Sequence, residues 1–240
     1  MTAAPPRRAP ERASGPRAWE VATFAVALGV AGLVTVALAS SGTETYVDVA
    51  TASGRTSARL TVRSGAAAGG AVADLPALAD LHTRWTAYVT GRIEDPPRTL
   101  DRELFTPDEY AHMADVRTVF ITAQACAVVA MAILVWLAWR ARREGRLARL
   151  ARAGALTALV GVGATGVLAA TAFDAAFLLF HRIFFPQGNF LFSADSSLLA
   201  IYPASYFYAV TLRIGLSFVA LAGLCAVVSH VALLRRSASA

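Results

Sequence analysis

The chain has 240 residues, of which 56% are hydrophobic, and its mean hydropathy is +0.53. This composition is too apolar for an ordinary soluble domain and indicates an integral membrane protein. The formal net charge of +6 rests on 22 basic residues, all of them arginine. Arginine clusters beside apolar runs are explained by membrane orientation and by attraction to anionic lipid, so nucleic-acid binding is not expected.

Four uncharged runs, at residues 21–42, 118–139, 153–173 and 214–234, are long enough to cross a membrane as helices. A hydrocarbon core of roughly 30 Å takes about 20 apolar residues in a helix. Backbone groups in lipid are satisfied only in helices or closed barrels, and these runs lack the alternation of barrel strands. We therefore predict an all-α membrane protein with four transmembrane helices.

The placement of arginine predicts how these helices are oriented. The N-terminus, the loop RARREGRLARLAR and the C-terminal tail are arginine-rich, which favours the cytoplasmic side for all three. The two other segments between spans then lie outside and form an extracytoplasmic head. The predicted order is a disordered cytoplasmic N-terminus (1–17), span one (18–42), outer segment one (43–117), span two (118–139), a cytoplasmic basic loop (140–152), span three (153–180), outer segment two (181–210), span four (211–234) and a cytoplasmic tail (235–240). Span one also resembles a signal peptide, but its apolar run is longer than a usual signal core, which favours a retained anchor.

The composition and the hydropathy pattern of the first outer segment change along its length. Residues 51–72 are rich in Ala, Gly, Ser and Thr, and we expect a short strand or a flexible linker there. From Leu75, apolar residues at helical spacing predict a helix that ends before Pro96-Pro97. The apolar face of this helix carries Leu78, Leu81, Trp85 and Val89.

A second helix is predicted to start within TPDEYAHMADV. Thr106 is a good N-cap, and Glu109 three residues later completes a capping box. Asp108 and Asp115 lie four and three residues from His112, so both carboxylates can share its face. The pattern fits a proton-handling histidine, and it equally fits a solvated helix start with an incidental histidine.

Span three contains GVGATG, a formal match to a dinucleotide-binding motif. No strand precedes it, and it lies inside an apolar run. We interpret Gly161, Gly163 and Gly166 instead as positions where another helix approaches closely in lipid.

The outer end of span three carries an ionisable group below a histidine. Asp174 precedes His181 by seven residues, or two helical turns, so both share a face if the helix continues. An ionisable group near the end of a span is costly unless it faces a cavity or a partner, so we expect Asp174 to point into the bundle. Its candidate partners are His181, Arg182 and Arg213, and a purely structural ion pair remains an alternative.

The stretch FLLFHRIFFPQGNFLF (177–192) holds six phenylalanines around one His-Arg pair. Pro186 to Asn189 is predicted to turn the chain, so that the phenylalanines at 184, 185, 190 and 192 dip back into the membrane surface. The arrangement suggests an outward-facing pocket at headgroup level that binds acyl chains and offers imidazole chemistry.

Two separated motifs resemble one known family. LFTPDEYAHMADVR before span two, together with FHRIFFPQGNFLF and DSSLLAIYP after span three, is similar to the bacterial lipoprotein intramolecular transacylase family, Lit. The resemblance covers most of the chain from about Leu81. It implies a four-span enzyme of the bacterial cell membrane that moves the sn-2 acyl chain of a diacylglyceryl lipoprotein onto the α-amine of its N-terminal Cys. The product is a lyso-form lipoprotein, and neither a cofactor nor a metal is implied.

The resemblance also assigns catalysis to His112 and His181. We expect His181 to act as the general base and His112, oriented by Asp115, to assist it or to bind the substrate amine. Candidate donors to the developing oxyanion are Arg182, Asn189 and Tyr202.

Other readings stay open at this point. A lipid or lipoprotein ester hydrolase using the same histidines and a non-enzymatic membrane scaffold both fit the sequence. A serine nucleophile at Ser196 or Ser197 is not favoured, because the sequence lacks a nucleophile-elbow motif. A transporter is not favoured either, because no charged residue lies at mid-depth in the predicted spans. His82, expected at the surface, and His230, near the cytoplasmic end of span four, are weaker candidates.

Overall fold

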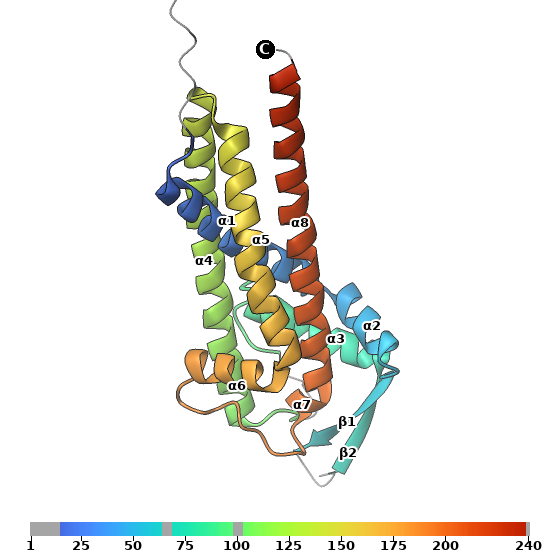
Figure 1. The fold of residues 1–240 in the computed structure, drawn as a ribbon. Helices are drawn as coiled ribbons and strands as arrows, with labels where there is room; N and C mark the ends of the chain where they lie inside the picture. The colour runs from blue at the N-terminus through green and yellow to red at the C-terminus, as the bar shows by residue number, and fades with distance from the viewer. Residues whose placement is uncertain (1–14, 64–68, 98–102, 239–240) are drawn as a thin grey trace, which may run out of the picture.

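The computed structural model describes residues 15–63, 69–97 and 103–238. Its bundle consists of α1 (Ala18–Ser40), α4 (Pro107–Arg143), α5 (Leu147–Thr171) and α8 (Ala204–Ala238). All four helices are long and apolar enough to cross a membrane, which confirms the predicted four-span class. The start of α1, the α4–α5 turn and the end of α8 lie at one end of the bundle, while the other elements gather at the opposite end (Figure 1).

The head at that opposite end is built from both predicted outer segments and from the last residues of predicted span three. It contains α2 (Thr43–Ala52), strands β1 (Ser57–Val62) and β2 (Gly69–Asp74), α3 (Leu75–Val89), α6 (Phe173–Phe184) and α7 (Ser197–Ile201). The two strands form an antiparallel hairpin in which Ser57 pairs with Asp74 and Val62 with Gly69. The predicted strand or linker at 51–72 is thus partly a hairpin, although residues 64–68 lie outside the described chain.

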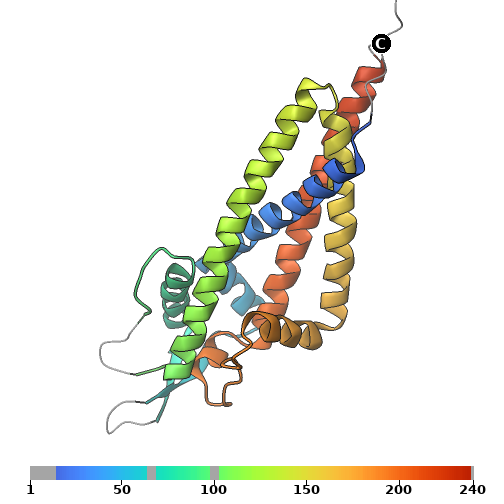
Figure 2. The same ribbon diagram turned by 90° about the vertical axis from the view of Figure 1, so that its left-hand side faces the viewer.

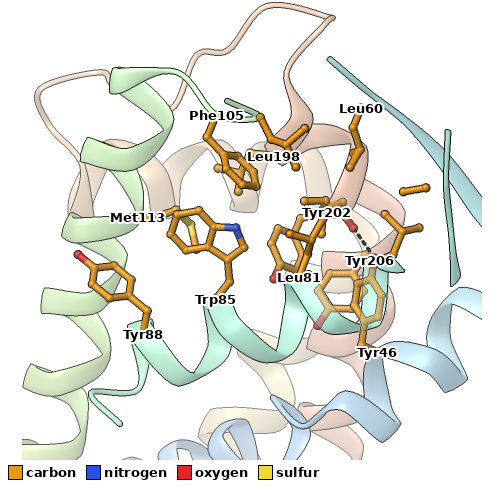
Figure 3. Packing of buried hydrophobic residues seen from close by; sticks show 14 of the residues in the cluster. Tyr46, Leu60, Leu81, Trp85, Tyr88, Phe105, Met113, Leu198, Tyr202 and Tyr206 are labelled. Atoms are coloured by element: carbon orange, nitrogen blue, oxygen red, sulfur yellow. Dashed lines mark hydrogen bonds between the residues drawn. The ribbon is translucent and has the colours of Figure 1, made fainter. Parts of the chain in front are cut away.

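The apolar face of α3 forms the centre of the head, as its periodicity predicts. Leu78, Leu81, Trp85 and Val89 are all buried, and Trp85 is completely covered. Figure 3 shows the Trp85 ring beside Phe105, with which it makes an edge contact at 5.1 Å between ring centroids. Burial of such large side chains stabilises the head by roughly 1.5–3 kcal/mol each.

His82 lies inside this core, so its predicted surface position is wrong. It is 3% exposed and stacks on Tyr46 at 4.5 Å between ring centroids. Its Nε2 lies 3.1 Å from the carbonyl oxygen of Ser41, and its Nδ1 lies 3.1 Å from the Tyr202 hydroxyl. A carbonyl only accepts, so Nε2 donates to Ser41 and Nδ1 accepts from Tyr202. The available sequence signal was spacing, because His82 follows Leu78 by four residues on the apolar face.

The start of α4 has the predicted capping box and an additional role. Thr106 Oγ1 accepts from the Glu109 amide at 3.1 Å, and Glu109 Oε2 accepts from the Thr106 amide at 2.6 Å. The second carboxylate oxygen, Oε1, accepts from the Leu198 amide at 3.0 Å and from the Ser196 hydroxyl. One buried carboxylate therefore joins the first turn of α4 to the first turn of α7.

The single long span predicted at 153–180 is wrong. The helix α5 ends at Thr171, and the backbone leaves the helical region at Ala172, with φ −129° and ψ 47°. The chain then runs across the bundle as α6 (Figure 1, Figure 2). The Thr171 hydroxyl donates to the Val167 carbonyl oxygen at 2.9 Å, a local bond of the kind that bends helices. Asp174 in the first turn of α6 favours a new helix start.

Other predicted boundaries shift because helices continue beyond the apolar runs. The helix α4 begins at Pro107 and ends at Arg143, well outside 118–139, and α8 begins at Ala204 rather than 211. The predicted loop at 140–152 is mostly helical, with only residues 144–146 between α4 and α5.

Close helix packing occurs at glycines other than the predicted ones. A Cβ on Gly161, Gly163 or Gly166 would meet no atom of the described chain within 4 Å, so the close approach expected at GVGATG is wrong. A Cβ on Gly154 would lie 2.4 Å from a ring carbon of Phe24, and one on Gly32 would lie 2.8 Å from Phe218. These two contacts place α1 against α5 and α8.

A buried ion pair joins α1 to the α4–α5 turn at the other end of the bundle. Glu20 is 1% exposed and receives two hydrogen bonds from Arg146, at 2.7 Å and 3.0 Å. The Glu144 carboxylate also pairs with Arg146, through Nε at 2.6 Å. Since a buried charge needs a partner, this contact specifies where α1 begins relative to α5.

We expect Glu20→Gln to destabilise the protein by about 3 kcal/mol, because a buried cation loses its main partner. Thermal unfolding in detergent micelles measures this, with Glu144→Gln as the control that removes the more exposed carboxylate. Equal melting temperatures for Glu20→Gln and Glu144→Gln would contradict the assignment.

His82 predicts a pH dependence of stability. Burial lowers the pKa of His82 from 6.5 to about 4, although its hydrogen bond to Ser41 acts in the opposite direction. Between these two pH values the unfolded chain binds more protons at His82 than the folded protein does. The His82 contribution to the free energy of unfolding is therefore fully present above pH 6.5 and is lost as the pH falls toward 4. The loss attributable to His82 should total about 3 kcal/mol.

Melting curves of wild type and His82→Gln across this pH window check the prediction. Wild type should lose stability more steeply than His82→Gln on acidification. Parallel pH profiles would show that His82 does not titrate on unfolding.

Candidate active site

The first turns of α4 and the last turns of α6 bring two histidines together. The rings of His112 and His181 stack with their centroids 6.0 Å apart and their planes 16° from parallel. His112 is buried, whereas His181 is half-buried. Two positive charges at this separation repel, so the arrangement favours a neutral form for at least one ring.

Three of the four predicted phenylalanines contact the histidine pair, and the fourth does not. Phe185 is buried and contacts both rings, at 4.7 Å from His112 and 5.4 Å from His181. Phe192 contacts His112, and Phe190 contacts His181. Phe184 is instead 48% exposed, so the four predicted phenylalanines do not all occupy one surface. The histidine pair thus lies in an apolar environment, where hydrogen bonds and charges act more strongly than in water.

The proton position on His181 follows from its backbone contact. Its Nδ1 lies 2.8 Å from the carbonyl oxygen of Phe177, one helical turn earlier on α6. That oxygen only accepts, so Nδ1 carries the proton in the neutral ring. Nε2 of His181 then holds the free lone pair and is the nitrogen able to accept a proton from a substrate.

Asp115 lies beside the pair, but it does not hydrogen-bond to His112 as predicted. Its Oδ2 accepts from Gln187 Nε2 and Asn189 Nδ2, both at 2.6 Å. The charge of Asp115 acts on His112 only at longer range. Asp108, the other predicted neighbour, is exposed. No sequence pattern indicated that Gln187 would contact Asp115.

Asp174 does not point into the bundle, so this prediction is also wrong. Its side chain is exposed and has no hydrogen bond or ion pair within the described ranges. Arg213, one of its candidate partners, lies 3.4 Å from Asp48 instead. Arg182 follows His181 on α6, is exposed, and likewise has no polar partner in the described part of the chain.

The remaining candidates lie apart from the histidine pair. Tyr202 donates to His82 in the core of the head rather than facing His181. Ser196 donates to Glu109, and Ser197 accepts from the Thr61 amide at 3.0 Å, so both hydroxyls have structural partners. His230 is exposed in the C-terminal part of α8, close to Arg235 and Arg236 in the sequence.

Comparisons with known proteins agree on one family. The sequence model of the lipoprotein intramolecular transacylase Lit matches residues 78–207, which include both histidines of the pair. No curated protein matches the chain.

Solved structures of Lit from Bacillus cereus share the fold. One has a TM-score of 0.69 at 13% identity and covers 92% of this chain and 97% of its own. A variant of that protein, in which one histidine is replaced by arginine, has a TM-score of 0.63 at 14% identity, with 92% of each chain covered. The family match spans more than half of the sequence, so the chain belongs to the lipoprotein intramolecular transacylase family and is an acyltransferase of bacterial membranes that acts on lipoproteins.

Proposed function

We propose that this enzyme moves the sn-2 acyl chain of a diacylglyceryl lipoprotein onto the α-amine of the N-terminal Cys of the same molecule. The observation that carries the proposal is the stacked His112–His181 pair within a shell of phenylalanines. Imidazole supplies proton transfer near neutral pH, and the phenylalanines supply an apolar surface for acyl chains.

The transfer exchanges one ester for one amide. The amine nitrogen attacks the ester carbonyl carbon and forms an N–C bond, and the C–O bond to the glyceryl oxygen breaks. The proton lost by the amine ends on the glyceryl oxygen, so no water or other co-substrate is consumed. Because ester and amine belong to one molecule, proximity supplies much of the acceleration.

His181 is the proposed general base. A lipoprotein α-amine has an ordinary pKa of about 7.7–8.0, so a base near neutral pH is suited to removing its proton. Nε2 of His181 has the free lone pair for this step, and the imidazolium that forms then protonates the leaving glyceryl oxygen. His112, whose ring stacks on that of His181, is proposed to hold the substrate amine.

The developing oxyanion needs a donor, and Arg182 is proposed for it. Arg182 is adjacent to His181 on α6, and its guanidinium has no polar partner within the described residues. Tyr202 is less suited because its hydroxyl already donates to His82.

The proposed orientation places the head on the outer face of the membrane. Arginine-rich segments at the α4–α5 turn and at the end of α8 support a cytoplasmic location for the opposite end and for both termini. The active site then faces the outer leaflet, where lipoproteins are anchored.

Cysteine labelling tests this orientation. In a Cys126→Ala/Cys225→Ala background, Ser193→Cys in the head should react with a membrane-impermeant maleimide in intact spheroplasts. Ser237→Cys at the end of α8 should react only after lysis, because the reagent cannot cross the bilayer. The reverse pattern would place the head in the cytoplasm.

The activity test is a mass spectrum of the N-terminal lipopeptide of a reporter lipoprotein, expressed in a host without other N-acylating enzymes. With the wild-type enzyme, one acyl chain should move to the amine with no change in total mass. With His181→Ala, transfer should fall by about 10²–10⁴-fold, as expected for loss of a general base. His230→Ala is the matched control, because it removes an exposed histidine from the opposite part of the protein.

Two outcomes would overturn the proposal. Loss of one acyl mass with a free amine would identify an ester hydrolase that uses the same histidines. An unchanged diacylglyceryl peptide, with the wild-type protein present in the membrane, would identify a protein without this activity.

A further inference from the structure

Asp115 determines which way the Asn189 side chain faces. A carboxylate only accepts hydrogen bonds, so the 2.6 Å contact from Asn189 requires the amide nitrogen on the Asp115 side. The amide oxygen Oδ1 must therefore point away from Asp115. Gly188 has φ +80°, a left-handed conformation that glycine adopts readily, and it allows Gln187 and Asn189 to reach the same carboxylate oxygen.

The Asn189 amide oxygen and one nitrogen of His112 are complementary. Oδ1 of Asn189 and Nδ1 of His112 are both buried, and neither has a hydrogen-bond partner among the described residues. Asn189 is hydrogen-bonded to Asp115, which lies one helical turn after His112 on α4, so the Asn189 and His112 side chains lie side by side. A buried polar atom without a partner is unfavourable, so a small adjustment that joins the two atoms is favoured. An amide oxygen only accepts, and this pairing therefore needs a proton on Nδ1 of His112.

We infer that Asp115 and Asn189 form a relay that sets the tautomer of His112. Asp115 orients the Asn189 amide, and Oδ1 of Asn189 holds the proton on Nδ1, which leaves the lone pair of neutral His112 on Nε2. Both are positioning residues, because they act on the substrate through His112. The inference rests on the proposed function in so far as His112 takes part in the transfer.

The relay gives the two rings the same protonation pattern. His181 also carries its proton on Nδ1, through the Phe177 carbonyl. The stacked pair then offers two acceptor nitrogens, both of them Nε2, to one substrate. This suits an amine, because one acceptor takes the departing proton. The other acceptor binds the second N–H and turns the nitrogen lone pair toward the ester carbonyl.

Steady-state kinetics of the full-length enzyme in micelles, on a synthetic diacylglyceryl lipopeptide, test the relay. Asn189→Ala should lower kcat about 10–100-fold, the usual effect of removing an orienting partner. KM should stay within about threefold, because the amide does not bind the acyl chains. Asp115→Asn keeps the shape but lets the Asn189 amide flip, so it should also lower kcat.

Gln187→Ala is the matched control. It removes a hydrogen bond to the same Asp115 oxygen without removing any group that faces His112. Its kcat should stay within about twofold of wild type, since exposed polar contacts contribute little. An equal loss of kcat in Gln187→Ala and Asn189→Ala would show that both contacts with Asp115 only hold the loop in place. This result would overturn the relay.

Nitrogen-15 NMR of histidine-labelled protein reads the tautomer directly, without substrate. The His112 signals are assigned by their loss in His112→Gln. Wild type at mildly alkaline pH should show a protonated Nδ1 and an unprotonated Nε2, whereas Asn189→Ala should show both tautomers. A single Nδ1-protonated form retained in Asn189→Ala would overturn the relay. A tautomer change in Asn189→Ala, combined with no transfer by wild type, would support the relay and overturn the proposed function instead.

Discussion

The buried carboxylate of Glu109 is the contact on which the site depends. It is 1% exposed and accepts hydrogen bonds from the Thr106 and Leu198 amides and from the Ser196 hydroxyl. Removing a carboxylate from water is costly, and these donors offset the cost only while both segments stay in place. The first turn of α4 is thereby joined to the start of α7, one helical turn before His112. The chain between α6 and α7 is anchored beside the histidine pair as a result.

The helix α4 carries three side chains that position the rest of the site. Glu109, His112 and Asp115 are spaced three residues apart, so they follow one another along one side of the helix. Both carboxylates bind the segment between α6 and α7, Glu109 at its end and Asp115 near its beginning, through the half-buried Asn189. His112 lies between these two anchors, and its surroundings are therefore specified from both sides.

The break at Ala172 brings His181 close to the start of α4. A helix that continued straight from Thr171 would carry His181 about 15 Å further along the axis of α5. The turn instead lays α6 across the bundle, where its last turns reach the start of α4 (Figure 2). The same turn leaves Asp174 exposed in the first turn of α6, far from the inward position that a continuous span implies.

Local sequence pattern was enough to predict four apolar spans, the capping box at Thr106, the buried face of α3 and the two motif histidines as candidates. Hydropathy, capping and periodicity are read within one or two helical turns, so they need no knowledge of the partner segment. The bend at Ala172, the burial of His82 and the amide partners of Asp115 became known only from the folded protein. Each of these arises where distant segments meet, and the free energy of a buried polar group depends on the donors and acceptors that the other segment supplies.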